Sequence, residues 1–194
     1  MLGSGSWGTA LAIQFARAGK ATRIWGRDPV QQAQMRAERC NRRYLPDAHF
    51  DDLLEVATSL DGALDGVTDV LIAVPSSGFR SFLTDLAPRL SAGMYVAWAT
   101  KGFEYGTGLL PHQVAHQVLG DNHEVAVLSG PTFAKEVGAG LPTAMVVASP
   151  DAAFATRIAE DLASPTFRTY ISTDILGGEL GGAVKNVIAI GARM

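Results

Sequence analysis

The sequence has a single cysteine, no excess of basic residues and no long apolar run. Cys40 alone excludes an internal disulfide and a thiolate zinc cage, and it fits a reducing compartment. The formal net charge is −3, so the chain lacks the electropositive surface that binding to nucleic acid or an anionic membrane needs. No basic-then-apolar leader opens the chain, and the apolar stretch near residues 184–192 is too short to span a bilayer. We therefore expect a soluble, cytoplasmic protein that binds neither nucleic acid nor membranes.

What the chain does have is enough apolar sequence for a core, arranged in alternating short and long segments. Hydrophobic residues make up 47% of its 194 residues, which is typical of a globular protein. The short β-branched or apolar runs predict strands at residues 21–25, 70–74, 95–99, 125–128, 144–148 and 167–171. Apolar residues at helical spacing predict helices at residues 9–17, 29–39, 79–90, 109–119 and 152–162. This alternation predicts an α/β fold with a mostly parallel sheet and helices on both faces.

Residues 3–8 read G-S-G-S-W-G, which matches the pattern G-x-G-x-x-G, and a helical run follows at once. In this pattern Gly3 would allow a tight turn, Gly5 would let the backbone approach a pyrophosphate, and Gly8 would allow close packing of helix and strand. The helix N-terminus then faces the anion. The pattern favours a doubly wound fold of the Rossmann type, in which the strand before the motif is reduced to residues 1–2.

Small, polar or cationic residues follow four of the predicted strands, at residues 26–28, 75–78, 100–102 and 129–132. Such residues are ordinary in turns. In an open α/β sheet, however, the ligand binds beyond the carboxyl ends of the strands, so the repetition indicates a binding crevice there.

Arg27 and Asp28 follow the second predicted strand, where an acidic residue selective for NAD usually stands. Arg27 can pair with a 2′-phosphate, and this favours NADP. Asp28 could bind a ribose hydroxyl, but with Pro29 behind it we expect it to cap the next helix.

Lys185 lies in a glycine-rich segment of helical character, and Gly181 and Gly182 share its face. A lysine over such a shelf of small residues, in a partly dry setting, has a lowered pKa and can exchange a proton. The alternative is a surface lysine on a tightly packing helix, and we favour catalysis. Lys101 follows the third strand and would bring a second cation into the same crevice, although a solvated loop lysine is the alternative.

Other candidates carry less weight. His112 and His116 lie four residues apart on a predicted helix, but no third metal ligand is evident, and we expect a solvated face. Trp25 and Trp98 are most simply core residues, whereas Trp7, within the glycine loop, could cover a cofactor. Tyr44 follows a basic stretch that could bind phosphate, although a charged helix end is more common. That stretch contains Arg36, Arg39, Arg42 and Arg43.

Together these blocks resemble bacterial NAD(P)-dependent glycerol-3-phosphate dehydrogenase along the whole chain. The matching blocks are residues 3–12, 25–28, 40–46, 99–102, 129–136, 140–144 and 180–192. The resemblance implies reversible hydride transfer between NAD(P)H and dihydroxyacetone phosphate, giving sn-glycerol 3-phosphate for phospholipid synthesis. The family uses either nicotinamide cofactor, so NADP is favoured here without excluding NAD.

The resemblance also implies roles for individual residues. Lys185 would be the general acid and base. The cofactor contacts would be the glycine turn (Gly3, Gly5, Gly8) with Ser6, Trp7, Arg27, Tyr44, Lys101 and Ala134, flanked by Pro75 and Phe79. The substrate contacts would be Lys101, Gly130, Thr132 and Lys185. No metal ligand is implied.

Two parts of the family pattern are missing from the sequence: most of the first strand, and the helical domain that continues beyond residues 191–194. We therefore expect residues 1–173 to form an NAD(P)-binding domain and residues 174–194 to form the first helix of a helical substrate domain. Because the resemblance places half of the substrate site in that domain, we expect the chain as given to bind cofactor weakly and to turn over little or no substrate.

Two alternatives stay open: a stand-alone dinucleotide-binding module, and a related two-domain reductase acting on a hydroxy acid or a sugar nucleotide. For the enzyme we expect a small-molecule substrate, and a homodimer of the full-length protein is left open.

Overall fold

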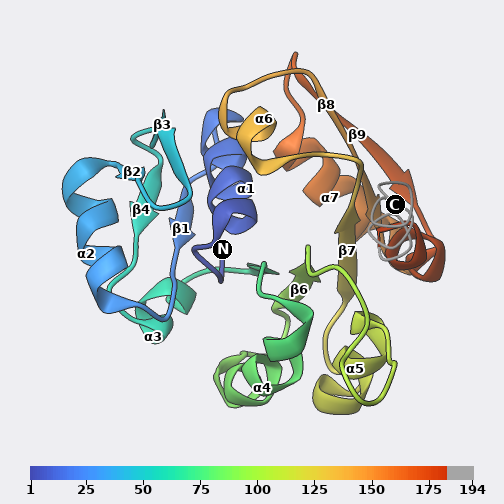
Figure 1. Ribbon diagram of the computed structural model, residues 1–194. Coiled ribbons are helices and arrows are strands. Elements are labelled where there is room, and N and C mark those ends of the chain that lie inside the picture. The colour runs from blue at the N-terminus through green and yellow to red at the C-terminus, as the bar shows by residue number, and fades with distance from the viewer. Residues whose placement is uncertain (183–194) are drawn as a thin grey trace, which may run out of the picture.

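A computed structural model describes residues 1–182 of the chain, and its centre is a five-stranded sheet (Figure 1). The strand order is β5-β6-β7-β8-β9. Their bounds are β5 Asp69–Ile72, β6 Tyr95–Trp98, β7 Val125–Ser129, β8 Thr143–Ala148 and β9 Phe167–Ser172. The β7–β8 pair is antiparallel and the other three pairs are parallel, so the sheet is mostly parallel, as predicted.

Two smaller sheets extend this framework on its N-terminal side. Strand β1 (Thr22–Ile24) pairs in parallel with β4 (Leu54–Val56), and β2 (Cys40–Asn41) pairs with β3 (Leu45–His49) in an antiparallel hairpin. Leu2 forms parallel bridges to both Trp25 and Ile72. The predicted short first strand is therefore present as this bridging residue, which joins β1 to β5.

The helices lie on both faces of the sheets (Figure 1). Helices α1 (Ser6–Arg17) and α7 (Ala152–Leu162) pack on one core cluster, whereas α4 (Ser76–Leu86) and α5 (Pro111–Leu119) pack on the other. The remaining helices are short or peripheral: α2 (Pro29–Glu38), α3 (Leu60–Leu64), the 3₁₀ turn η1 (Ala87–Arg89) and α6 (Ala134–Gly138). Strand β6 and the residue after it show why both faces are covered, since Val96 and Trp98 enter one cluster while Ala97 and Ala99 enter the other.

All six predicted strands and all five predicted helices are present. The predicted 79–90 helix begins earlier, at Ser76, and ends at Leu86 before η1. The elements that the sequence did not predict are short: β2, β3, β4, α3 and α6. Residues 175–182 are also helical, in the region expected to open a second domain, and that domain boundary stays a prediction.

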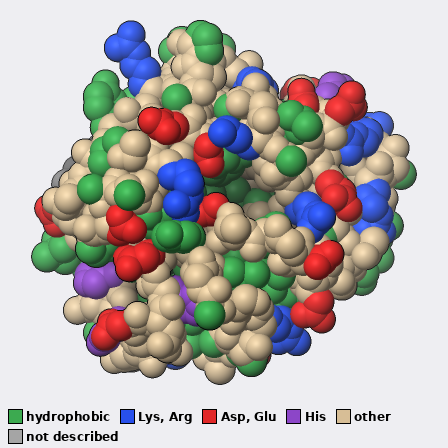
Figure 2. All heavy atoms as spheres, turned by 180° about the vertical axis from the view of Figure 1, so that it is seen from behind, with side chains coloured by type: hydrophobic (Ala, Val, Ile, Leu, Met, Phe, Trp, Pro, Cys, Tyr) green, Lys and Arg blue, Asp and Glu red, His purple; other side chains and the backbone are tan. Residues whose placement is uncertain are grey.

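The surface carries charges of both signs. Figure 2 shows Lys and Arg side chains interspersed with Asp and Glu on the face opposite to that of Figure 1. Across residues 1–182, none of the helices combines the length and the apolar character needed to span a membrane.

Candidate functional site

The glycine turn begins directly after the Leu2 bridge. Gly3 has φ +119°, and a Cβ there would lie 2.3 Å from the Ala73 carbonyl oxygen. A Cβ on Gly8 would lie 1.9 Å from the Gly3 carbonyl oxygen. Both positions therefore require glycine, the first for backbone conformation and the second for packing.

Gly5 differs from the other two glycines. Its φ is −72°, and among the described residues nothing lies within 4 Å of the position that its Cβ would occupy. Gly5 is also the N-cap of α1, and glycine has no side chain that could accept hydrogen bonds from the first N–H groups of the helix. An open backbone at the positive end of a 12-residue helix is suited to binding an anion such as a pyrophosphate.

A buried network of neutral polar groups supports this turn from beneath. The Ser4 carbonyl accepts hydrogen bonds from Gln31 Nε2 at 3.0 Å and from Asn41 Nδ2 at 2.9 Å. Asn41 Nδ2 also donates to Thr9 Oγ1 at 2.8 Å, and Gln32 Nε2 donates to Ser4 Oγ at 3.0 Å. These bonds tie α1, α2 and the β2–β3 hairpin to the turn without placing a charge beneath it. This network could not be predicted from the sequence, because polar residues on helices usually indicate surface.

A cleft of about 380 Å³ runs from the glycine turn along the ends of β1 and β5. Its lining includes the turn (Gly3, Gly5), the β1 exit (Arg27, Asp28), the hairpin (Arg43, Tyr44) and the β5 exit (Pro75). The cleft therefore brings the turn together with Arg27 and Tyr44. Their contact with a cofactor stays a prediction. Trp25, expected in the core, is half-buried instead: it lines the cleft and stacks on Phe82 with ring centres 6.3 Å apart.

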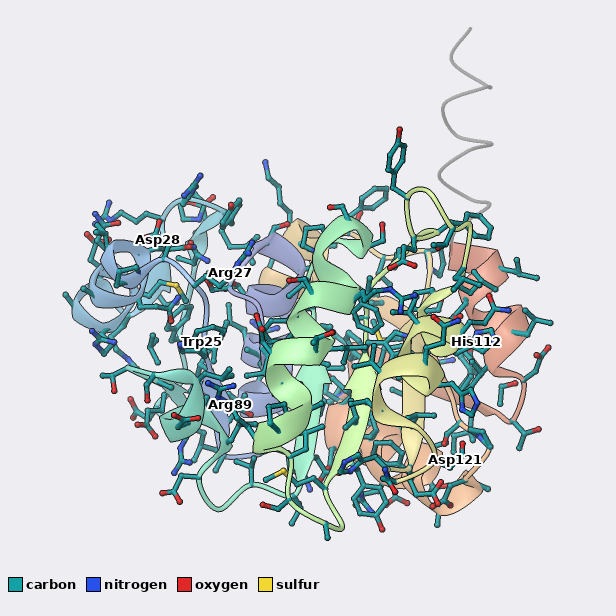
Figure 3. The ribbon with its side chains drawn as sticks, turned by 90° about the horizontal axis from the view of Figure 1, so that it is seen from below. Trp25, Arg27, Asp28, Arg89, His112 and Asp121 are labelled. Carbon is teal, nitrogen blue, oxygen red and sulfur yellow. The ribbon has the colours of Figure 1, made fainter. Side chains whose placement is uncertain are left out.

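Asp28 caps a helix, as expected. Its Oδ1 accepts hydrogen bonds from the backbone N–H groups of Val30, at 3.0 Å, and Gln31, at 3.2 Å, at the start of α2. Arg27 and Asp28 lie beyond the end of β1, near Trp25 (Figure 3).

A second group of candidates meets at the exits of β6 and β7. Lys101 Nζ donates to the Gly130 carbonyl oxygen at 3.1 Å and lies 5.0 Å from the centre of the Trp7 ring. A Cβ on Gly130 would lie 2.8 Å from the Ala144 carbonyl oxygen, so this backbone also requires glycine. The Lys101 ammonium, the Trp7 ring and the Gly130 backbone thus come together from three distant parts of the sequence.

Two buried polar atoms in this group face no hydrogen-bond partner among the described residues: Trp7 Nε1 and Thr132 Oγ1. Buried donors and hydroxyls are normally satisfied, so each of these two atoms is a candidate for a hydrogen bond to a bound ligand. Ala134, at the start of α6, is half-buried against the core cluster that also receives Trp7.

Lys185 lies outside the described residues, and its place in the site stays a prediction. The helix at residues 175–182 ends beside Lys101. A Cβ on Gly182 would lie 2.9 Å from Ser129 Oγ and 3.8 Å from Lys101 Cγ, so the absence of a side chain lets this helix approach the β6 and β7 exits.

The expectation of a solvated face for His112 and His116 is wrong for His112. His112 Nδ1 lies 2.6 Å from Glu179 Oε2, and Glu179 Oε1 accepts hydrogen bonds from Trp98 Nε1 at 2.7 Å and from the His112 backbone N–H at 3.0 Å. The Glu179 side chain is 2% exposed, and this burial raises its pKa above the usual range. His112 lies on the opposite side of the molecule from Arg27 (Figure 3). Through Glu179, His112 joins the 175–182 helix to α5, and Trp98 joins that helix to β6. Residues 1–182 hold no cluster of three or more side chains suited to a metal ion.

A sheet with a glycine turn at the N-terminus of α1, and ligand-facing groups at the strand exits, defines the class of dinucleotide-binding domains. Within this class, residues 1–155 match the family profile described as NAD-dependent glycerol-3-phosphate dehydrogenase N-terminus. The chain belongs to this family, and the resemblance seen in the sequence is confirmed.

Relatives and a solved structure agree with this assignment. The chain is 52% identical over 192 residues to the glycerol-3-phosphate dehydrogenase [NAD(P)+] of Nitrosococcus oceani, covering 99% of this chain and 56% of that protein. It is 50% identical over 195 residues to the Vibrio cholerae protein of the same name, covering 100% and 57%. The crystal structure of glycerol-3-phosphate dehydrogenase from Coxiella burnetii superposes with a TM-score of 0.92 at 43% identity, covering 97% of this chain and 57% of that one. The chain thus spans a little over half the length of these relatives.

Proposed function

We propose that the protein carrying this sequence reduces dihydroxyacetone phosphate reversibly to sn-glycerol 3-phosphate, with NADPH or NADH as cofactor. The observation that carries the proposal is the geometry of the glycine turn. Backbone atoms occupy the space beside Gly3 and Gly8, whereas no described residue fills the space beside Gly5 at the start of α1. The names of the relatives support the substrate, and the exits of β6 and β7 supply groups that suit a phosphorylated ketone.

The residues fit a bound dinucleotide in separate ways. The backbone at Gly5 and the first turn of α1, including Ser6, would hold the pyrophosphate. Arg27 and Tyr44 line the cleft that would take the adenosine end. Trp7 and Ala134 would lie against the other end, where Trp7 Nε1 is ready to donate. When bound, the nicotinamide supplies the hydride.

The substrate would bind beside Lys101, at the exits of β6 and β7. The Lys101 ammonium, held at the Gly130 carbonyl, would attract the phosphate or polarise the ketone oxygen. The Thr132 hydroxyl, which has no hydrogen-bond partner among the described residues, would form a hydrogen bond with the substrate. Lys185, assigned from its position in the sequence, would donate a proton to the C2 oxygen as hydride reaches C2, and would remove that proton in the reverse reaction.

The proposal includes a cytoplasmic location and no nucleic-acid or membrane partner. The single cysteine and the net charge of −3 support these points. A homodimer of the longer protein stays a prediction.

The first test measures cofactor binding to the purified chain through the quenching of its tryptophan fluorescence during titration with NADPH and NADH. We expect saturable binding of at least one of them, and no saturable binding of either would contradict the proposal.

The second test concerns the reaction. In the same sequence extended with the remaining residues of the Nitrosococcus oceani relative, we expect NADPH oxidation that depends on dihydroxyacetone phosphate and is abolished by Lys185→Ala with cofactor affinity unchanged. Oxidation driven instead by a hydroxy acid's oxo form would indicate the related two-domain reductase. Binding without turnover on any ketone would indicate a dinucleotide-binding module.

A further inference from the structure

The four arginines of the basic stretch at residues 36–43 have different surroundings in the structure. Arg39 donates to the carbonyl oxygens of Leu54 at 2.8 Å and Asp51 at 2.6 Å, so it joins β4 to the end of α2. Arg42 pairs with Glu38, and Arg36 is exposed on α2. Arg43 is the one member of this stretch that lines the cleft beside the glycine turn.

Arg43 reaches the cleft from the turn between β2 and β3. Its guanidinium carbon lies 5.4 Å from the centre of the Tyr44 ring, and Nη1 lies 3.7 Å from Asp28 Oδ2. The side chain is 63% exposed, so it holds its place through these two contacts and is accessible to a ligand. Arg27, from the β1 exit, lines the same cleft.

Asp28 determines what this pair of arginines can recognise. A carboxylate at this strand exit usually accepts hydrogen bonds from the ribose hydroxyls of NAD. Here its Oδ1 is engaged by two backbone N–H groups of α2 and its Oδ2 faces Arg43. The other carboxylate in the lining, Asp85, lies in the last turn of α4. Two guanidiniums therefore line the cleft beside a carboxylate that is already occupied, and this arrangement favours an incoming dianion over a neutral hydroxyl.

We propose that Arg43 is a second phosphate ligand of the cofactor site and that, together with Arg27, it selects the 2′-phosphate of NADP(H) over the 2′-hydroxyl of NAD(H). This inference rests on the proposed dinucleotide function and adds to it the residue that sets cofactor choice. On binding, the 2′-phosphate would take the place of Asp28 Oδ2 as the partner of Arg43, while Asp28 Oδ1 stays on the α2 backbone.

The test uses two nucleotides that probe the adenosine end alone, 2′,5′-ADP and 5′-AMP, with calorimetric titration of the purified chain. For Arg43→Gln we expect the Kd of 2′,5′-ADP to rise by about tenfold to a hundredfold, as for a lost charge-assisted hydrogen bond. The Kd of 5′-AMP should change by less than about twofold, because the remaining contacts are retained. Arg36→Gln is the matched control, since Arg36 is an exposed arginine of the same stretch outside the cleft lining, and both Kd values should stay as in the unsubstituted chain.

A second variant tests the competition with Asp28. Asparagine also caps helices well, so Asp28→Asn should preserve α2 while releasing Arg43, and it should tighten 2′,5′-ADP by about twofold to fivefold. Equal losses for both nucleotides in Arg43→Gln, or no loss for either, would overturn the assignment of Arg43 while leaving the dinucleotide site standing. If the unsubstituted chain binds neither nucleotide, both this assignment and the proposed function fail.

Discussion

Two buried polar networks fix two separate regions of this molecule, the glycine turn and the 175–182 helix, and they differ in charge. The network beneath the glycine turn is built from the neutral groups of Ser4, Thr9, Gln31, Gln32 and Asn41. The network beneath the 175–182 helix is centred on a carboxylate, Glu179, held by Trp98 and His112.

The difference fits the proposed role of the glycine turn. A carboxylate beneath the glycine turn would repel a pyrophosphate, whereas amides fix the backbone without opposing an anion. Glu179 does not line the cleft and bonds to Trp98 of β6, in the core cluster that packs against α4 and α5. A buried carboxylate can serve there as an anchor at the cost of desolvation, which raises the pKa of Glu179. The stability that the neutral network contributes should therefore not depend on pH, whereas the stability that the Glu179 network contributes should depend on it.

The largest expected effect comes from closing the glycine turn. Gly8→Ala places a methyl group 1.9 Å from the Gly3 carbonyl oxygen, and this oxygen cannot move without opening the turn. We expect the free energy of unfolding, measured by urea denaturation, to fall by about 3 kcal/mol or more. Gly5→Ala is the matched control, because its methyl group meets nothing within 4 Å among the described residues. Equal stability of the two variants would refute the packing assigned to Gly8.

The charged anchor should be next in size. Glu179→Ala leaves the buried Trp98 N–H and the His112 groups without their acceptor, and we expect a loss of about 2–4 kcal/mol in the free energy of unfolding. Glu179→Gln keeps an acceptor for Trp98 and should cost less than about 1 kcal/mol at neutral pH. Glu160→Ala, at an exposed carboxylate on α7, serves as the control and should be nearly neutral.

The same variants test the pH contrast. Because the pKa of Glu179 is raised in the folded state, that state holds a proton that the unfolded chain has already lost. The contribution of Glu179 to stability therefore falls as pH rises from its unfolded pKa towards its folded pKa. Glu179→Gln should remove this slope. An unchanged slope would show that Glu179 is not the group that titrates.

A smaller effect is expected from a carboxylate near the surface, on the loop that carries Lys101. Arg80 and then Thr107 lower the pKa of Glu104 to about 2. The stability that ionised Glu104 contributes to the folded state is fully present above the unfolded pKa, near 4.5, and is lost as pH falls towards 2. Glu104→Gln should therefore flatten the acid limb of the stability profile between these pH values. A profile that still declines as steeply as in the unsubstituted chain would contradict the role of the Arg80–Glu104 pair.

The same two regions show how far sequence reasoning reaches. The glycine turn, the Asp28 cap and the convergence of Lys101 with the β7 exit could be predicted, because each depends on local backbone requirements or on strand ends meeting at one edge. The polar network and the Glu179 anchor could not. His112 and Glu179 are 67 positions apart, and no local pattern distinguishes a histidine that meets a buried carboxylate from one that faces water. Asn41 and Gln31 likewise become core residues only once α1, α2 and the hairpin have packed together.

The central claim is that Gly5 is open because the cofactor's pyrophosphate approaches it, and the most direct measurement is NADPH binding to Gly5→Ala. The backbone conformation of Gly5 suits alanine, so the melting temperature should stay unchanged or rise slightly. The Kd of NADPH should rise by about tenfold or more, since the methyl group occupies the space of the pyrophosphate. An unchanged Kd in a variant with an unchanged melting temperature would contradict the account.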